Sequence, residues 1–158
     1  MNQAVVLRPS RPGDLEQIAT LFHDSVHQVA GADYNARQLD AWAPPGFDRS
    51  RWQDRLAGEE VVVAEFAVGL AGFCAWTGQG YLDLLFVHPS CLRRGVATAL
   101  LAEAEQFLRA HQVARVHTQA SITAQPFFLR QGYRLVQHQT VHVRGVDLPN
   151  AVMEKLLA

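Results

Sequence analysis

The sequence predicts a single α/β domain built on a mixed sheet. Two observations lead to that fold class. Apolar, β-branched runs of strand length alternate with segments whose apolar residues recur at helical spacing. Between Tyr81 and Thr118, a strand, a long amphipathic helix and a second strand follow one another, which favours parallel pairing with a right-handed crossover. Because about 100–200 residues is the usual size of a domain, we expect residues 1–158 to form one domain.

The N-terminal third is predicted to contain one short strand and two helices. Val5 to Arg8 is expected to be a strand, and Ser10 to Asp14 has the capping residues and early proline of a helix start. Apolar residues from Leu15 to Val29 follow helical spacing. A shorter helix is expected from Asn35 to Trp42, ended by two prolines and a glycine.

The remainder is predicted to be richer in strands. A polar, Arg-rich stretch, Asp48 to Gly58, comes first. The expected strands are Val61–Val68, Leu70–Trp76, Tyr81–Val87, Ala114–Thr118, Tyr133–Arg144 and Asp147–Leu156. The expected helices are Val96–Leu108 and Ala124–Gln131, the second ended by Gly132. The strands that flank the central unit are expected to pair antiparallel, the first two of them as a hairpin.

Composition argues against several classes of protein. Lys plus Arg number 14 and Asp plus Glu 15, a net charge of -1, whereas a general nucleic-acid binder carries a clear basic excess. No apolar run approaches the roughly 18–20 residues of a membrane helix, and the start MNQAVVLRPS contains no apolar signal core. Two cysteines make no disulfide framework. We therefore expect a cytoplasmic protein that binds neither nucleic acid nor membrane.

The segment Cys91 to Thr98 connects a predicted strand to the long helix and has the features of an anion site. Gly95 at the helix entry leaves backbone N–H groups free to bind a ligand. Arg93 and Arg94 oppose the helix macrodipole there, by about 0.3–1 kcal/mol each when exposed. No carboxylate follows before Glu103, so a bound anion would remove the conflict. The alternative is a solvated arginine pair on a loop.

Asp83 is a candidate for acid–base chemistry because it is the only carboxylate between Glu65 and Glu103 and lies inside an apolar strand. By the alternation of a strand it is expected to share a face with Leu85 and Val87. A carboxylate in that setting is either paired or has a raised pKa, and both suit a general base or an ammonium anchor. The alternative is an Asp that is solvated or paired with an arginine.

Two further segments carry side chains whose role the pattern leaves open. Ser121 to Tyr133 places a helix with adjacent Phe127 and Phe128 after a strand end, and from the residues alone this pair favours core over ligand wall. His23 and His27 are four residues apart, which can place two imidazoles on one helix face. Since no third ligand of fitting spacing accompanies them, a solvated or substrate-facing pair is favoured over a metal site.

Two motifs together resemble those of the GNAT superfamily of acyl-CoA N-acyltransferases. The strings LFVHP (residues 85–89) and RGVATALL (residues 94–101) resemble its motif A, and Ser121-x-x-Ala124-x-x-Phe127-Phe128-x-x-x-Gly132-Tyr133 resembles its motif B. The resemblance covers about Leu7 to Leu156, and residues 120–128 are similar to a branch of small, stand-alone bacterial members. It implies a largely antiparallel sheet with helices on both faces.

The resemblance also implies where acetyl-CoA would bind. It would lie between splayed strands, Tyr81–Val87 and Ala114–Thr118, with pantetheine paired to the backbone around Phe86 and Val87. The backbone N–H of Leu85 would face the thioester oxygen as an oxyanion-type donor. The residues expected at the pyrophosphate are Arg93, Arg94, Gly95, Val96, Ala97 and Thr98, through their N–H groups or charges. Those expected on the cofactor's other side are Ser121, Ala124, Phe127 and Phe128.

Three residues depart from the family pattern. Leu92 stands where Gln or Arg is usual and cannot donate a side-chain hydrogen bond. Arg93 stands where many members have Gly. Phe128 occupies the position of a Tyr that often protonates the leaving thiolate. The enzyme would therefore use water, another residue, or release of the thiolate without a dedicated acid.

The expected reaction is direct transfer of an acetyl group to a primary amine of a small molecule or peptide. Asp83 would take the ammonium proton, directly or through water. Weaker candidates on the acceptor side are Tyr81, Tyr34, His23 and His27, while Trp42 would form either an aromatic wall or a cap over the core. Acidic residues of the first 58, namely Asp24, Asp33 and Asp40, would favour a cationic amine unless they are simply solvated.

Two other classes of protein fit the same resemblance. One is an acyl-CoA-binding sensor without turnover, suggested by Leu92 and by Phe128. The other is an interaction protein that kept only the fold. No metal is implied, and a homodimer is compatible with the family, in which dimers are common.

Overall fold

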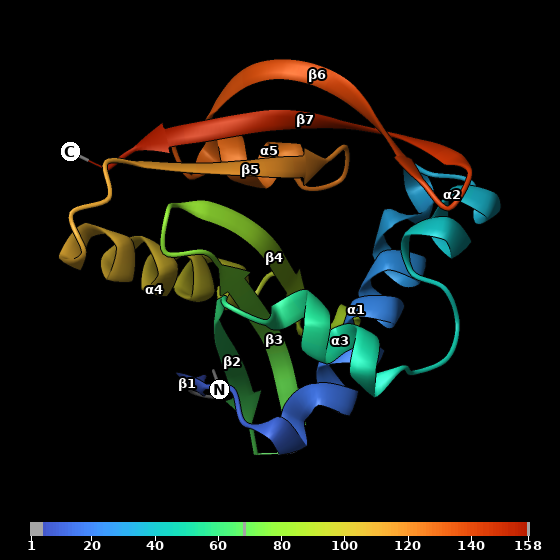
Figure 1. Ribbon diagram of the computed structural model, residues 1–158, viewed down its shortest axis with the longest axis horizontal. Helices are drawn as coiled ribbons and strands as arrows, with labels where there is room; N and C mark the ends of the chain where they lie inside the picture. Colours follow the sequence, from blue (N-terminus) through green and yellow to red (C-terminus); the bar gives the residue numbers. More distant parts are fainter. Residues whose placement is uncertain (1–4, 68, 158) are drawn as a thin grey trace.

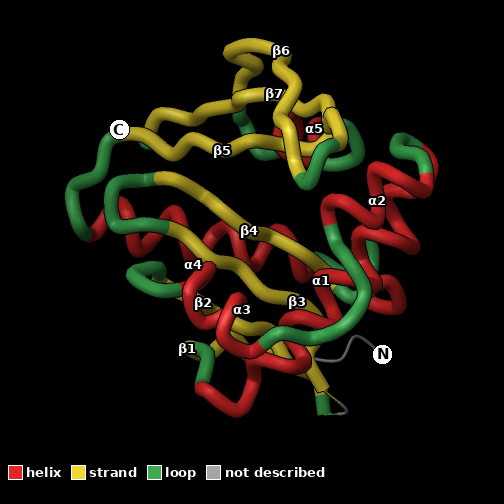
Figure 2. The backbone as a smooth tube through the Cα atoms, turned by 45° about the vertical axis from the view of Figure 1, so that its right-hand side comes forward, coloured by secondary structure: helices red, strands yellow, loops and turns green. Residues whose placement is uncertain are grey.

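The computed structural model describes residues 5–67 and 69–157, which form a seven-stranded mixed sheet with helices on both faces (Figures 1 and 2). The strands are β1 (Val6–Pro9), β2 (Glu60–Phe66), β3 (Gly69–Trp76), β4 (Tyr81–Val87), β5 (Arg115–Ser121), β6 (Arg134–Val143) and β7 (Val146–Leu156). Their order is β1-β2-β3-β4-β5-β7-β6. Only β4 and β5 pair in parallel; all other neighbours are antiparallel. The predicted fold class is confirmed.

The helices divide between the two faces of the sheet. They are α1 (Leu15–Val29), α2 (Ala36–Trp42), α3 (Arg49–Leu56), α4 (Val96–Ala110) and α5 (Gln125–Arg130). On one face, Ile18 and Val26 of α1 pack with Phe73 of β3 in one apolar cluster. On the other face, Leu100 of α4 and Phe128 of α5 belong to a second cluster. None of the described helices is long and apolar enough to cross a membrane.

Helix α3 occupies the Arg-rich stretch for which the sequence indicated no element. Asp48 is its N-cap, with Oδ1 accepting a hydrogen bond from the N–H of Arg51 at 3.1 Å. Trp52 and Leu56, four residues apart, pack against the α1 side of the core. Only these two positions carry the apolar signal, which is why the stretch resembled a solvated loop. The predicted strand end at Val68 lies outside the described residues, and β2 ends at Phe66.

A β-bulge interrupts β4 at Asp83. In the register with β3, Trp76 pairs with Leu82 and Ala75 pairs with Leu84, so Asp83 is the extra residue. Such a bulge bends the strand and shifts the alternation of every side chain beyond it.

The bulge corrects the expected orientation of Asp83. Asp83 and Leu84 both line the cavity on the α1 side of the sheet. Leu85 and Val87 instead pack with the cluster on the α4 side. The prediction that Asp83 shares a face with Leu85 and Val87 is therefore wrong, because strict alternation fails where one strand gains a residue.

Strands β4 and β5 pair over two residues only and then diverge. Tyr81 pairs with His117, and Leu82 pairs with Thr118, whose Oγ1 also donates to the Leu82 carbonyl at 2.9 Å. Beyond these residues the two strands separate, as Figure 2 shows. The sheet is thus split between β4 and β5. We call the gap between the two strands the slot; it is closed only at its base, where Tyr81 and Leu82 of β4 pair with β5.

Candidate acetyl-CoA and acceptor site

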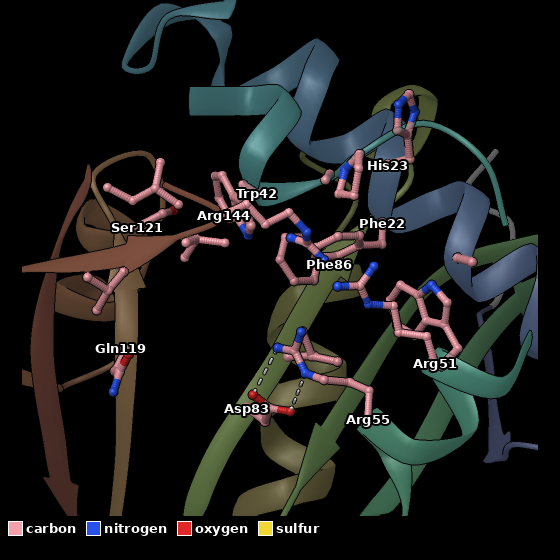
Figure 3. Close-up of a pocket in the computed structure, with 18 of the residues that line it drawn as sticks. Phe22, His23, Trp42, Arg51, Arg55, Asp83, Phe86, Gln119, Ser121 and Arg144 are labelled. Carbon is pink, nitrogen blue, oxygen red and sulfur yellow. Dashed lines mark hydrogen bonds and ion pairs between the residues drawn. The ribbon is translucent and has the colours of Figure 1, made fainter. Parts of the chain in front are cut away.

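A cavity of about 870 Å³ lies over the open end of the slot, bounded by β4, β5, the N-terminal helices and the β6–β7 hairpin (Figure 3). Side chains from segments far apart in the sequence meet there. Seven of the residues predicted for the site line it: His23, Tyr34, Trp42, Tyr81, Asp83, Phe86 and Ser121. The other predicted residues lie outside its lining, on the rest of β4, on α1 and around the starts of α4 and α5.

The backbone of β4 has hydrogen-bonding groups on the edge that faces the slot. His88 N–H donates to Ala71 of β3 at 2.8 Å, so this residue points toward β3. Because successive residues of a strand point their N–H and C=O to opposite sides, Val87 and Leu85 point toward β5. No described residue of β5 pairs with them. The predicted roles of the Leu85 N–H and of the Val87 backbone are geometrically available.

Contrary to what the resemblance implied, the backbone of Phe86 is not placed to pair with pantetheine, and the residue contributes its ring to the cavity instead. It pairs with Phe73 of β3, so its backbone faces β3 and not the slot. Its ring instead lines the cavity, 4.9 Å from the ring of Phe22 and at 78° to it. Of the two residues expected to pair with pantetheine, only Val87 has its backbone on the open edge.

The start of α4 offers further unpaired N–H groups. Gly95 is the N-cap in a left-handed conformation, and no described side chain caps the helix. The N–H groups of the first turn therefore have no partner within the helix. Val96 is buried, so it can contribute only its backbone, whereas Arg93, Arg94 and Thr98 are exposed. This geometry suits an anion, and the pyrophosphate contact remains a prediction.

Arg93 has a φ of 62°, in the region that favours glycine. The glycine that the resemblance leads one to expect at this position would adopt that conformation without strain. Leu92 beside it is 43% exposed and donates no hydrogen bond from its side chain.

The helix that follows β5 is tied to the strand end by Ser121, whose Oγ accepts a hydrogen bond from the N–H of Ala124 at 3.1 Å. Phe128 is 4% exposed and packs edge-on against Phe127 and Tyr133. Its ring belongs to the core, in line with the alternative drawn from the residues alone. Phe127 is only partly buried against the same cluster. Contact of the two rings with a cofactor remains a prediction.

Aromatic rings form one wall of the cavity. Trp42 lies edge-on to Tyr34 at 5.4 Å and to Phe86 at 6.2 Å. Trp52 lies edge-on to Phe22 at 5.3 Å on the other side of Phe86. Trp42 lines the cavity and also packs against the core cluster on the α1 side, so its geometry fits both of its predicted roles, and contact with an acceptor remains a prediction.

The hydroxyl of Tyr34 is fully engaged in hydrogen bonds that hold the fold together. Its hydroxyl donates to the Pro149 carbonyl of β7 at 2.6 Å and accepts from the Ile122 N–H, after β5, at 3.0 Å. Burial raises its pKa. Because its proton is used in holding β7, Tyr34 is poorly placed to protonate a leaving group.

Asp83 makes an ion pair with Arg55 of α3. Arg55 donates to its two oxygens at 3.2 and 3.3 Å, and the Asp83 side chain is only 12% exposed. The alternative given for Asp83 from the sequence, an Asp paired with an arginine, therefore agrees with its contacts. The pair still leaves Asp83 on the cavity, where Figure 3 shows it below Phe86.

Glu59 stands beside this pair, just before β2. Its Oε1 is buried without a hydrogen-bond partner among the described residues. Burial, together with a hydrogen bond and the charge of Asp83, raises the pKa of Glu59 to about 8. With this pKa Glu59 is mostly protonated at neutral pH, and a protonated Glu59 can donate a hydrogen bond to Asp83. Tyr81 on the same strand also has a raised pKa, chiefly because of burial.

The two histidines of α1 are stacked, with ring centroids 4.2 Å apart. His23 lines the cavity, while His27 Nε2 is 2.8 Å from the carbonyl oxygen of Ala43 and does not line it. Within residues 5–67 and 69–157, no three His, Cys, Asp or Glu side chains are grouped to hold a metal ion.

Sequence reasoning missed three arginines of the cavity, Arg51, Arg55 and Arg144. A signal for the first two existed, because they are four residues apart and follow a capping Asp48. Arg144 comes from the turn between β6 and β7, and no local pattern connects it with α3. The carboxylates expected to favour a cationic amine, Asp24, Asp33 and Asp40, do not line the cavity.

A sheet split between two parallel strands, beside an uncapped helix start, is the architecture expected for the acyltransferases that the motifs resemble. Residues 30–156 match the model of the acetyltransferase (GNAT) domain. The chain is 38% identical over 149 residues, 94% of each chain, to the uncharacterized N-acetyltransferase YafP of Escherichia coli K12. The chain belongs to the GNAT acetyltransferase family.

Solved structures agree with this assignment. A GCN5-related N-acetyltransferase from Rhodopseudomonas palustris superimposes with a TM-score of 0.93 at 32% identity, covering 99% of this chain and 98% of that one. The PaiA N-acetyltransferase from Thermoplasma acidophilum, in complex with coenzyme A, has the same fold, with a TM-score of 0.71 at 15% identity and coverage of 97% and 99%.

Proposed function

We propose that this protein transfers the acetyl group of acetyl-CoA directly to a primary amine. The observation that carries the proposal is the open edge of β4, which runs from the slot into a cavity that contains Asp83. The presence of coenzyme A in the PaiA structure supports the choice of cofactor. Acetyl-CoA supplies the activated carbonyl carbon; the Val87 backbone, the Leu85 N–H and the α4 start would hold it.

The acceptor nitrogen needs a free electron pair before it can attack the carbonyl carbon. Asp83 takes one proton from the ammonium group, directly or through a water molecule. The nitrogen then forms a bond to the carbonyl carbon, the carbon–sulfur bond breaks, and coenzyme A leaves as thiolate. The nitrogen loses its second proton to water as the amide forms, and Asp83 returns its own proton to the solvent. The Leu85 N–H faces the carbonyl oxygen, where negative charge develops.

Arg55 and Glu59 fit supporting roles for Asp83. Arg55 fixes the carboxylate through two hydrogen bonds. Glu59, neutral over much of the range below its pKa of about 8, donates to Asp83 without adding a second negative charge.

The leaving thiolate takes its proton from water. Tyr133 donates its hydroxyl to Glu105, and Tyr34 donates to Pro149, so neither phenol is free. Phe128 carries no hydroxyl. A thiolate is a good enough leaving group for this step to proceed without a dedicated acid.

Acetyl-CoA-dependent thiol release over a panel of amines tests the proposal. We expect at least one acceptor to support turnover, and we expect Asp83→Asn to lower kcat about 100-fold with unchanged acetyl-CoA affinity by calorimetry. An Arg37→Gln variant, altered on the exposed side of α2 away from the cavity, serves as the control. Full turnover by Asp83→Asn, with an unchanged pH profile, would exclude Asp83 as the base.

The alternative functions give different results in the same experiments. A sensor binds acetyl-CoA but releases no thiol with any amine, which is the outcome suggested by Leu92 and Phe128. An interaction protein that kept only the fold shows no acetyl-CoA binding at millimolar concentration.

A further inference from the structure

We propose that the acceptor carries an oxyanion, a carboxylate or a phosphonate, which the guanidinium groups of Arg51 and Arg144 bind. This inference rests on the proposed function for the place of the amine, near Asp83. It names the class of acceptor, an amine that is also an acid.

The three arginines of the cavity have different partners. Arg55 is engaged by Asp83. Arg144 uses Nη1 to donate to the Ala41 carbonyl of α2 at 2.6 Å, which orients its guanidinium and leaves other donors free. Within the described residues, no carboxylate lies within the 4.0 Å of an ion pair from Arg51 or Arg144. Figure 3 shows both groups extending over β4 near Phe86.

The positive charges of this cluster repel one another. Burial lowers the pKa of Arg144, and the charges of Arg51 and Arg55 lower it further. No neighbouring carboxylate offsets this effect at Arg144. An anion between the guanidinium groups would relieve the repulsion, and the planar donors of arginine match the oxygens of a carboxylate or phosphonate.

The backbone at Arg144 is a second, independent observation. Arg144 has a φ of 47° and Gly145 a φ of 78°, so both central residues of the β6–β7 turn are left-handed. A two-residue turn of this kind favours Asn or Asp before Gly, whereas arginine there is strained. Strained residues that persist in a fold gather at functional sites. Arginine at position 144 is explained by what its side chain binds.

The remaining charges of the cavity are compatible with this assignment. Asp48 and Asp54 also line it. Asp48 is occupied as the N-cap of α3, and neither is within ion-pairing distance of Arg51 or Arg144. Because Asp24, Asp33 and Asp40 lie outside the lining, they do not favour a purely cationic acceptor, and the arginines instead favour an amine that also carries an anionic group. The aromatic wall of Phe22, Trp42 and Phe86 suits an apolar ring on the acceptor, such as the side chain of phenylalanine.

Binding of stable product analogues tests the oxyanion site without turnover. The probes are N-acetyl-L-phenylalanine, its phosphonate analogue and N-acetyl-L-phenylalaninamide, which lacks the charge; Kd is measured by calorimetry in the presence of coenzyme A. We expect at least one acid to bind 10-fold or more tightly than the amide. Arg144→Asn and Arg51→Gln should each remove most of that difference, while Arg37→Gln retains it. The carboxylate and the phosphonate show which oxyanion is preferred.

Arg144→Asn also separates binding from folding. Because Asn tolerates the left-handed conformation, which offsets the lost hydrogen bond to the Ala41 carbonyl, the melting temperature of this variant should stay close to that of the wild type while its affinity for the acid falls. Equal affinity for acids and amide, no measurable binding of either acid, or preference for the acid retained in Arg144→Asn would each overturn the proposal.

Thiol release with L-phenylalanine and L-phenylalaninamide distinguishes the two levels of inference. Faster turnover of the acid, lost in Arg144→Asn, supports both the oxyanion site and the proposed function. Equal turnover of acid and amide overturns the oxyanion site but still supports the proposed acetyltransferase function. If the acid binds in a manner that depends on Arg144 but no amine is turned over, the oxyanion site is supported and the proposed acetyltransferase function is overturned.

Discussion

The two halves of the site differ in the groups that form them. The cofactor half consists of backbone: the open edge of β4 at Leu85 and Val87, and the N–H groups at the start of α4. The acceptor half consists of side chains from α1, α2, α3, β4 and the β6–β7 hairpin. Backbone features depend on local sequence, whereas the side chains meet only in the folded chain. The first half should therefore tolerate side-chain changes that the second does not.

The base of the slot, which both halves share, should be the most sensitive point. Gly80 has a φ of 104°, and a Cβ there would lie 2.3 Å from the Arg115 carbonyl oxygen. We expect Gly80→Ala to lower the free energy of unfolding by about 2–4 kcal/mol, measured by chemical denaturation. Gly78→Ala is the matched control, since nothing lies within 4 Å of its Cβ. A loss from Gly80→Ala as small as that of the control would mean that β4 and β5 can separate freely.

Tyr34 ties the N-terminal helices to the sheet, because its hydroxyl bridges β7 and the residue after β5. Tyr34→Phe leaves the Pro149 carbonyl and the Ile122 N–H without this partner, so we expect a loss of about 1–3 kcal/mol in the free energy of unfolding. Tyr81→Phe is the comparison, because the Tyr81 hydroxyl makes no hydrogen bond with the described residues. Equal stability of the two variants would contradict the bridging role.

The same division explains how much could be predicted from the sequence. β4 was predicted with its observed bounds because Tyr81 to Val87 is a continuous apolar run ended by His88 and Pro89. The Gly95 helix start was equally local. The bulge at Asp83 was missed because it depends on the register with Ala75 and Trp76.

The acceptor half was predicted only in part. Helix α3 was missed because its two apolar residues find their partners on α1, far away in the sequence. Arg144 was missed because a hairpin turn gives no local sign that its side chain reaches α2. Trp42, His23 and Asp83 were found, since aromatic, imidazole and lone acidic groups stand out by type alone.

The carboxyl pair of the acceptor half should make stability depend on pH. Glu59 binds a proton in the folded state up to about pH 8 but only to about pH 4.5 when unfolded, so the folded state holds more protons in this window. Stability contributed by this proton falls as the pH rises from 4.5 to 8.

Glu59→Gln should remove that dependence. We expect its free energy of unfolding to vary less than that of the wild type between pH 5 and pH 8, by on the order of 1 kcal/mol because solvent screens the pair. The measurement is chemical denaturation at intervals of pH, with Glu60→Gln, on the exposed neighbouring residue, as control. Parallel pH curves for wild type and Glu59→Gln would contradict the raised pKa of Glu59.

The smallest effect is expected in the cofactor half. Arg93→Gly relieves the left-handed conformation at φ 62° and removes one exposed charge. Because backbone N–H groups form the anion site, we expect acetyl-CoA affinity to fall no more than about fivefold, the effect of one exposed charge of about 0.3–1 kcal/mol. Calorimetry checks this, and a loss of a hundredfold would show that side chains rather than backbone hold the phosphates.

The most direct test of the account asks whether acetyl-CoA lies along the open edge of β4. Amide signals of β4 and of the α4 start can be followed residue by residue by NMR, with hydrogen exchange, as acetyl-CoA is added. The account predicts new protection at Leu85 and Val87 and at Gly95 to Thr98, with little change at Leu84 and Phe86, whose N–H groups face β3. Binding that leaves Leu85 and Val87 unprotected, or that alters Leu84 and Phe86 equally, would contradict it.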